Sequence, residues 1–370
     1  MERNLPRVDF KYLDLGTLIT IIDPFEDIRW DQFVLQHPLA WLCHFSGWKK
    51  VLEDSFPQMK GIYLVKWDSC GQSIQAGLPL FFINSKLTGK RLVSIPFATL
   101  SDPLIMDNMD AAELIKASIT ICQALKADHL EVRATKSEIL DANSALFARR
   151  SYKHHSLDVS TSPDELMKRF DRTCVRQRIS RALKSTLSLK IAESEDDLRT
   201  FYKLYLITRK RVHLPPQPFI FFQKLWDIFS HVNMITLLLA QLDGQSIAGL
   251  MLFKHGNRIS AEIAASDDHY KGISPNHFLF WAAIQLAHEE GRKVFDFGRT
   301  SPKNATLMHF KSHWGAKISD LTEYYYYEKQ NNKSDDNEDK LSHSAIRIIS
   351  TLLPMNLYQL FGNFCYRHLG

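Results

Sequence analysis

The chain has 370 residues, 45% hydrophobic and 24% charged, so it contains enough apolar material for more than one core. Its 46 Lys and Arg against 41 Asp and Glu give a formal net charge of +5, too small an excess for a protein that coats nucleic acid. The five cysteines are widely spaced and never form a Cys-x-x-Cys pair, which indicates reduced thiols rather than a disulfide framework.

Export and membrane insertion both require apolar segments. The first residues, MERNLPRVDFKYLDLG, lack the apolar core of about 7 to 15 residues of a secretory signal. No stretch reaches the roughly 18 uninterrupted apolar residues of a membrane-spanning helix. We therefore expect a cytoplasmic protein.

The first predicted elements form a β-hairpin. IYLVKW (62–67) and AGLPLFFI (76–83) are apolar strands, and Gly-Gln-Ser-Ile (71–74) marks the turn between them. The pattern then predicts, in order, a strand at 91–97, a helix at 111–126, a strand at 129–134, a helix at 137–150 and a strand at 152–160.

A basic segment, TSPDELMKRFDRTCVRQRISRALK (161–184), follows. We predict a helix here, with Ser162 as its N-cap and Pro163 in its first turn. Helical periodicity places residues 169, 172 and 176 on one face. Further on, PPQPFIFFQKLW (215–226) is a proline-punctuated entry into another helix.

The second half repeats the order of the first. Strands at 234–241 and 248–255 flank a second Gly-Gln-Ser-Ile turn, and a strand at 259–266 follows. The next helix has clear ends, with Ser274 at the N-cap, Pro275 at the first helical position and Gly291 just past the end. The remaining predicted elements are a strand at 294–298, a helix at 305–314 and a strand at 318–329.

Two copies of three antiparallel strands, helix, strand, helix and strand predict an α+β fold. Each copy would be a mixed central sheet flanked by helices. We expect the first domain at 1–160 and the second at 161–329. The polar, acidic segment at 330–343 is predicted to be a disordered linker.

The apolar tail at 344–370 is interrupted by Pro354 and Gly362. Two interpretations remain open. The tail is an amphipathic helical segment that contacts a membrane surface or a partner, or it is a helix pair that packs on the main body.

One block of the second half is specific. Phe-Asp-Phe-Gly-Arg (295–299), followed by Phe-Lys-x-x-Trp-Gly (310–315), resembles the signature of the FemAB-type transferases and of a cellulose-biosynthesis-like branch of the GNAT acyltransferases. The resemblance implies tandem GNAT-like (acyl-CoA N-acyltransferase) domains and acyl transfer in a cleft of the second. The donor would be an aminoacyl-tRNA or an acyl-CoA, and the acceptor a nucleotide- or lipid-linked glycan precursor of peptidoglycan or exopolysaccharide.

Two features depart from these families. The long helical hairpin of some Fem proteins is missing, and the GNAT phosphate loop has only a poor counterpart at 269–274, which includes Tyr270. The sequence therefore leaves the cofactor unknown. No Gly-x-Ser-x-Gly, His-Glu-x-x-His or Walker pattern is present. Amide formation needs none of these, because donors aimed at the developing oxyanion suffice.

The resemblance makes Lys311 the candidate oxyanion partner, with Phe310 beside it in the signature. The alternative is a solvated lysine on the face of a helix. Arg299 follows a strand at its carboxyl end, where ligands collect, and its guanidinium could hold a phosphate. The alternative for Arg299 is an ion pair with Asp296 or Glu323. Asp296 itself is interpreted as structural.

Further substrate contacts are expected on both sides of this block. The helix entry at 274–277 offers backbone N–H groups to an anion. His309 and His313 have the spacing of a shared metal, but without an obvious third ligand we predict no metal site. The expected substrate-binding residues besides Arg299 are Arg172, Arg176, Arg178, Arg211, Tyr270, Asn276 and Trp314.

The best-supported hypothesis is thus an N-acyltransferase acting on an amino group of a cell-envelope precursor. A second hypothesis is a non-catalytic double-GNAT scaffold that binds an anionic glycan intermediate or an assembly partner. A third is RNA binding through the helix at 168–184, which predicts affinity that falls steeply with salt.

Overall fold

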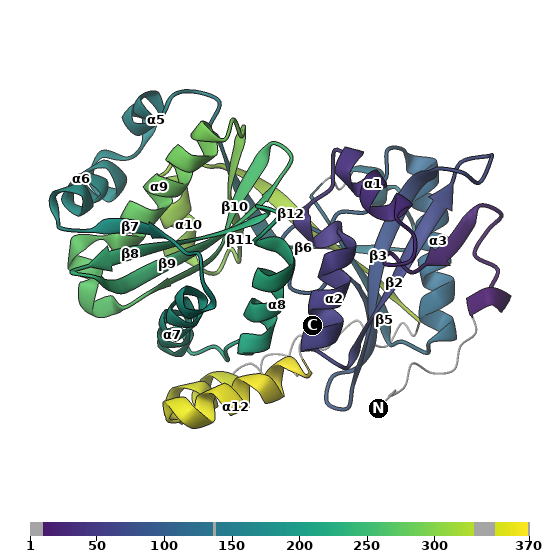
Figure 1. The fold of residues 1–370 in the computed structure, drawn as a ribbon. Helices are drawn as coiled ribbons and strands as arrows, with labels where there is room; N and C mark the ends of the chain where they lie inside the picture. The colour runs from purple at the N-terminus through teal and green to yellow at the C-terminus, as the bar shows by residue number, and fades with distance from the viewer. Residues whose placement is uncertain (1–9, 136–137, 329–344, 369–370) are drawn as a thin grey trace. The chain divides into compact units, whose positions relative to one another are not determined.

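The computed structural model describes residues 10–135, 138–328 and 345–368. They divide into two compact units. Unit 1 contains the described residues within 1–151, 321–339 and 364–370, and unit 2 contains those within 152–320 and 340–363. The predicted linker at 330–343 lies outside the described residues. In each unit, helices cover the faces of a sheet (Figure 1).

Unit 1 has the strand order β1-β2-β3-β4-β5-β12, and its neighbouring strands are antiparallel except for the parallel pair β4 and β5. Helix α3 packs on one face, while Trp30 of α1 and Tyr63 of β2 make an edge-to-face contact on the other. The elements are η1 (Phe10–Tyr12), β1 (Ile19–Ile22), α1 (Arg29–Gln36), η2 (Leu42–His44), α2 (Ser46–Ser55), β2 (Met59–Trp67), β3 (Ile74–Ser85), β4 (Gly89–Ser94), α3 (Asn108–Ala124), β5 (His129–Ala134) and α4 (Glu138–Asp141).

Unit 2 has the strand order β6-β11-β10-β9-β8-β7, with β10 and β11 as its parallel pair. Helix α9 lies on one side of this sheet and α7 on the other (Figure 1). The elements are β6 (Phe147–Asp158), α5 (Pro163–Arg169), η3 (Arg172–Arg176), α6 (Gln177–Lys184), β7 (Ser188–Ile191), α7 (Glu195–Arg211), α8 (Phe219–Phe229), β8 (Ile235–Leu242), β9 (Gln245–His255), β10 (Arg258–Ser266), η4 (Asp268–Ile273), α9 (Pro275–Glu289), β11 (Val294–Thr300) and α10 (Ala305–Ser312). Strand β12 (Lys317–Tyr327) begins in unit 2 and continues into unit 1.

The predicted repeat is confirmed. The order of strands and helices from β2 to β6 matches the order from β8 to β12. Both Gly-Gln-Ser-Ile turns carry a glycine at positive φ, Gly71 at 68° and Gly244 at 80°. The fold class is the predicted one, a mixed sheet with flanking helices in each unit.

The closing strands are exchanged between the two copies. Residues Thr322–Tyr327 of β12 pair with β5 and complete the sheet of unit 1. Residues Lys153–Asp158 of β6 pair with β11 in unit 2. The compact units are therefore divided within β6 and within β12, and not at the sequence boundary 160/161.

Three predicted helices differ from the structure. The helix expected at 137–150 is limited to α4, because Asn143 forms a turn that leads into β6. The segment at 161–184 is not one helix, since it breaks after Arg169 and continues as the π-helical turn η3 and then α6. Ser274 precedes α9 as expected, but with φ of 61° and without a side-chain cap.

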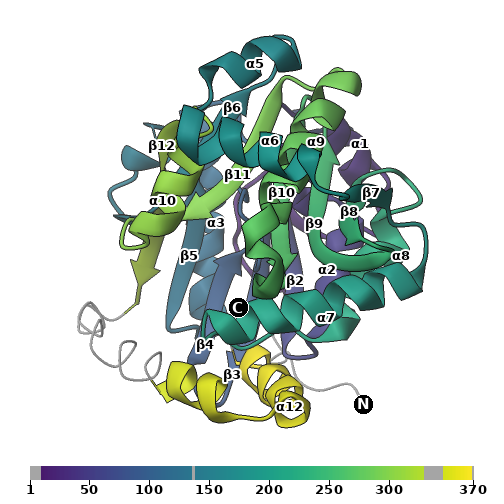
Figure 2. The same ribbon diagram turned by 90° about the vertical axis from the view of Figure 1, so that its left-hand side faces the viewer.

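The tail is helical at residues 345–352 and in α12 (Met355–Tyr366). Tyr358 is fully buried and donates to the carbonyl of Leu214 in the same unit. Gly362 lies within α12 and does not interrupt it. Because glycine has no side chain, the helix can approach Pro216, whose carbonyl oxygen would clash with an added Cβ. Figure 2 shows α12 beside the end of α7. The interpretation of the tail as a helix pair that packs on the main body therefore holds at Tyr358 and Gly362.

Candidate active site

The crossover from β11 to α10 shapes the centre of the predicted site. A β-bulge lies between Asp296 and Gly298, opposite Ser156 and His155 of β6. The Asp296 carboxylate accepts a hydrogen bond of 2.7 Å from the Gly298 N–H. Gly298 has φ of 73°, which an L side chain rarely adopts. The bulge turns the carbonyls of Gly298 and Arg299 toward α10, as the contacts of Lys311 demonstrate.

Lys311 lies inside this crossover. Its side chain is 5% exposed, and Nζ donates to the carbonyl of Gly298 at 2.9 Å and to that of Arg299 at 3.1 Å. Burial lowers the pKa of Lys311 to about 8, although Asp296 and Glu262 favour the charged form. The residue is therefore a buried cation at neutral pH, not a solvated charge on a helix face.

Asp296 is the anion that faces this cation. It is fully buried and binds Nε2 of His154 at 2.8 Å and the guanidinium of Arg258 at 2.6 Å. Burial alone would raise the pKa of Asp296, but His154, Arg258 and the Gly298 N–H outweigh burial and lower the pKa to about 2. Asp296 was expected to be structural, and the sequence did not indicate its partners His154 and Arg258.

His155 neighbours Lys311 and is a residue that sequence reasoning missed. It is fully buried, and its imidazole interacts with the Gly298 backbone. Burial, followed by the charge of Lys311, lowers the pKa of His155 to about 4. A neutral imidazole therefore lies against the lysine at neutral pH. In the sequence it was only one of two histidines in the strand predicted at 152–160.

Phe310 and Trp314 belong to the aromatic core of unit 2. Trp314 is fully buried, and its ring stacks on His277 with a centroid distance of 5.8 Å. Phe310 is half-buried and contacts both rings edge-on. Trp314 thus supports the crossover from beneath, whereas Phe310 reaches the surface.

Arg299 extends from the end of β11. Its guanidinium lies 4.8 Å from the ring centroid of Tyr152, a cation–π contact, and its side chain is half-buried. Asp296, one of the two ion-pair partners considered for Arg299, is engaged by His154 and Arg258 instead. Arg299 and Lys311 meet through the Arg299 carbonyl.

The predicted basic contacts lie on different elements. Arg172 and Arg178 are exposed around η3 and the start of α6, and the half-buried Arg176 has a buried Nε without a partner among the described residues. The pKa of His277 is lowered to about 4, mainly by burial and in smaller part by the nearby charge of Arg178. Arg211, at the end of α7, instead forms an ion pair with Asp268.

The entry of α9 holds Tyr270 and Asn276. Tyr270 is half-buried in η4, and Asn276 donates through Nδ2 to Ser266 Oγ at 3.2 Å. Arg181 of α6 reaches the carbonyl of Gly272 in the same turn at 3.4 Å. In Figure 2, α6 lies beside α9, which agrees with this contact. The structure thus brings the basic segment next to the α9 entry.

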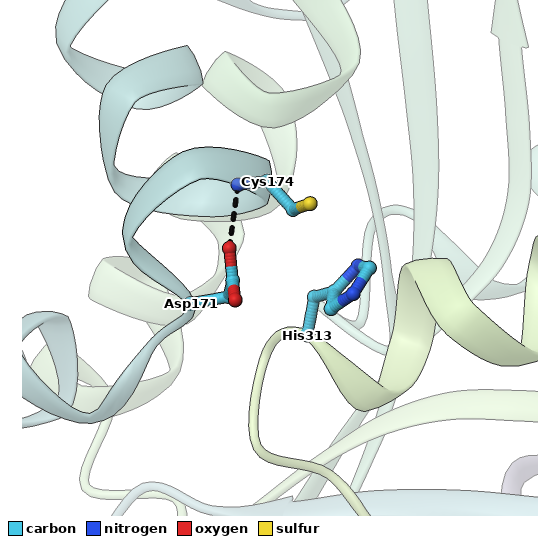
Figure 3. Close-up of side chains that lie close together, drawn as sticks. All are labelled: Asp171, Cys174 and His313. Carbon is cyan, nitrogen blue, oxygen red and sulfur yellow. Dashed lines mark hydrogen bonds between the residues drawn. The ribbon is translucent and has the colours of Figure 1, made fainter.

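A cluster of metal-ligand types also lies near α10. Asp171, Cys174 and His313 converge, with one ligand atom of each within 4.8 Å of the others (Figure 3). The sequence indicated only the His309 and His313 spacing, and the partners of His313 proved to be about 140 residues earlier in the chain. A surface hollow beside α7 and α8 lies elsewhere, and none of the predicted site residues lines it.

Comparisons with known proteins agree with this picture. Residues 169–312 match the family model of the acetyltransferase (GNAT) domain. The FemX crystal structure superposes with a TM-score of 0.67 at 17% identity, covering 85% of this chain and 98% of that one. This chain has the FemX fold. A tandem GNAT protein from the clavulanic acid biosynthesis pathway also superposes, with a TM-score of 0.53 at 11% identity over 84% of this chain and 98% of that one.

Among curated relatives, a lipid II:glycine glycyltransferase of Staphylococcus saprophyticus is 31% identical over 125 residues. That match covers 31% of this chain and 30% of the relative. A protein of the same name from Staphylococcus haemolyticus is 29% identical over 94 residues, 24% of this chain and 22% of the relative. The resemblance drawn from the 295–315 signature is confirmed. In the part of the chain that the structure describes, no helix has the length and apolarity to cross a membrane.

Proposed function

We propose that this protein is an N-acyltransferase that attaches an aminoacyl or other acyl group to an amino group of a peptidoglycan precursor. The observation that carries the proposal is Lys311, a buried cation bonded to the end of β11 inside the signature crossover. Support comes from the GNAT model match over 169–312 and from the name of the curated relatives, lipid II:glycine glycyltransferase.

In this proposal Lys311 stabilises the negative charge on the carbonyl oxygen while the amide forms. A buried cation is effective here because the low local dielectric strengthens its interaction and little reorganisation is needed. The Gly298 and Arg299 carbonyls hold Nζ in place while the neutral acceptor amine attacks the ester or thioester carbon of the donor. The C–N bond forms, the C–O or C–S bond breaks, and the proton lost by the amine leaves with the tRNA hydroxyl or the coenzyme A thiol. Phe310, at the surface next to Lys311, would contact the substrate.

The proposed acceptor is a lipid-linked precursor, and the proposed donor is an aminoacyl-tRNA. The exposed Arg172 and Arg178, near the α9 entry, supply cations for the phosphates of such ligands. Arg299, Tyr270 and Asn276 are proposed to contact the acceptor, while Trp314 supports them from the core. Arg211 is assigned a weaker contact because Asp268 already pairs with it.

A transfer assay tests the function. The full chain is incubated with lipid-linked precursor and either aminoacyl-tRNA or acyl-CoA, and mass spectrometry detects the added acyl mass. We expect product with the aminoacyl-tRNA donor. Product with acyl-CoA alone would overturn the donor assignment. Tight precursor binding without transfer from either donor would favour the non-catalytic scaffold over the enzyme.

The Lys311→Met variant tests the catalytic assignment. We expect turnover to fall by about 100-fold or more, comparable to removal of one oxyanion donor. The control is Lys303→Met, which removes an exposed lysine from the same crossover and should leave turnover unchanged. Thermal unfolding of both variants establishes that they are folded. Unchanged turnover in a folded Lys311→Met protein would remove Lys311 from the mechanism.

We further propose that the tail contacts the membrane that carries the acceptor. Ile348, Leu352, Leu357 and Leu360 expose large apolar side chains, whereas Tyr358 is buried. Arg347 is exposed next to Ile348, so anionic lipid headgroups complement these side chains.

A further inference from the structure

The cluster of Asp171, Cys174 and His313 is not used by the proposed transfer reaction. All three residues are half-buried, and one ligand atom from each lies within 4.8 Å of the other two. Figure 3 shows the thiol of Cys174 and the imidazole of His313 directed into the same space, with the Asp171 carboxylate beside them. Sulfur, nitrogen and carboxylate oxygen are thus brought together from two distant segments.

Backbone hydrogen bonds hold the two segments together. The Asp171 N–H donates to the carbonyl of His313 at 2.9 Å, so the start of η3 is attached to the residue that follows α10. Asp171 also caps η3, because its Oδ1 accepts from the N–H of Thr173 at 2.9 Å and of Cys174 at 2.6 Å. The ligand-bearing backbone is therefore fixed without a metal, and a π-helical turn of this kind is frequent at functional sites.

The hydrogen bonds of Asp171 and His313 are compatible with binding of a cation. The Asp171 carboxylate accepts hydrogen bonds on Oδ1 from the Thr173 N–H at 2.9 Å, the Thr173 hydroxyl at 3.1 Å and the Cys174 N–H at 2.6 Å. Among the described residues, neither ring nitrogen of His313 makes a hydrogen bond, and His313 is half-buried.

The donor set also selects the metal. Thiolate, imidazole and carboxylate together are typical of zinc, with bonds of about 2.0–2.3 Å in a tetrahedron. Such bonds place ligand atoms about 3.3–3.8 Å apart. The cluster, whose atoms lie within 4.8 Å, needs to contract by no more than about 1.5 Å.

We propose that Asp171, Cys174 and His313 bind one Zn²⁺ ion, with water at the fourth position. The ion would join η3 to the residue after α10, two residues beyond Lys311. The ion is then a positioning device, since it fixes the end of the helix that carries Lys311 against the basic segment. Metal binding itself does not depend on the proposed transfer reaction.

Metal binding is measured on the purified full chain, first stripped with a chelator and then given one equivalent of Zn²⁺ or Co²⁺. We expect one metal per chain after desalting, a thiolate-to-cobalt charge-transfer absorption, and a zinc-dependent rise in the unfolding temperature. Binding of no metal, or a cobalt spectrum without thiolate absorption, would overturn the proposal.

Matched variants identify the ligands. Asp171→Asn keeps the cap, because an Asn oxygen accepts the same backbone hydrogen bonds, but it removes the charge. Cys174→Ser and His313→Ala remove the other two ligands. We expect each to weaken zinc binding by more than about 100-fold, since losing a residue that only hydrogen-bonds to a metal ligand already lowers metal affinity by about 10- to 100-fold.

The controls use the same residue types outside the cluster. Cys70→Ser alters an exposed cysteine in unit 1, and His309→Ala alters an exposed histidine one turn before His313. Both should bind zinc as the wild type does. If Cys70→Ser weakens binding as much as Cys174→Ser, or His309→Ala as much as His313→Ala, the assigned site is wrong.

Discussion

Lys311 and His155 show how burial changes the chemistry of a residue. A lysine and a histidine in this sequence would ordinarily be solvated, but the bulge at Gly298 encloses both. The lysine donates to two carbonyl acceptors, and the imidazole is buried beside this cation. The buried pair therefore has one stable charge state near neutrality, with a cationic Lys311 and a neutral His155.

His155 predicts acid sensitivity of the fold. Its pKa is about 4 in the folded chain, lowered by burial, Lys311 and His154, against 6.5 for the ordinary group, while Asp296 and Gly298 act in the opposite direction. The unfolded chain thus binds more protons between pH 6.5 and 4, so stability falls as the pH falls through this window. The loss is about 3 kcal/mol at most.

The test replaces His155 with Leu and follows thermal unfolding from pH 7 to pH 4. We expect the variant to lose less stability than the wild type across this window, even if it starts from a lower value. His231→Leu, at an exposed site, is the control and should keep the wild-type slope. An identical pH slope in all three proteins would contradict the role of His155.

At the scale of elements, one glycine in each copy lets a helix pack closely on the sheet. The segment Ala-Gly-Leu occurs at 76–78 in β3 and at 248–250 in β9. A Cβ on Gly77 would lie 2.6 Å from Trp30 of α1, and a Cβ on Gly249 would lie 2.5 Å from Phe201 of α7. The short repeat visible in the sequence therefore records the same helix-on-strand contact in both units.

Gly249→Ala should destabilise unit 2 by about 1–3 kcal/mol, because Phe201 is fully buried and its ring has little room to move. Urea unfolding measures the change. The control is Gly272→Ala, where nothing lies within 4 Å of the added Cβ, and its effect should stay within about 0.5 kcal/mol. Equal stability of the two variants would mean that this contact is looser than described.

The helix ends show how far local signals reach. Ser162, Pro163 and Gly291 mark helix ends in the structure as the sequence predicts. The break between α5 and α6 was not predictable from periodicity, because Asp171 caps a new turn inside a segment that has helical spacing throughout. The metal-ligand cluster depends on this break, and that is one reason why its members were not grouped from the sequence.

At the scale of the whole molecule, the apolar surface of the tail predicts binding to anionic vesicles. Replacing Leu352 and Leu360, which are 77% and 64% exposed, with serine should weaken sedimentation with anionic vesicles without lowering the unfolding temperature. The control is Leu87→Ser, at a site in unit 1 that is 65% exposed. If the tail variant binds vesicles as the wild type does, the tail is not the membrane contact.

The sequence predicted most of the architecture and only part of the site. Periodicity and turn residues revealed the duplicated order of elements, because hairpins and caps are local features. The pairing partner of a closing strand is not local, since β6 pairs with β11 and β12 pairs with β5, each in the other half of the chain. The enclosure of Lys311 likewise depends on a bulge that no residue pattern marks except Gly298.

The exchanged closing strands have a consequence for synthesis. Because β12 completes the sheet of unit 1, the edge of β5 stays unpaired until residue 327 has left the ribosome. An exposed edge of this kind invites pairing with other nascent chains. A chain divided between the two copies would therefore leave β5 without its neighbour β12 and β11 without its neighbour β6.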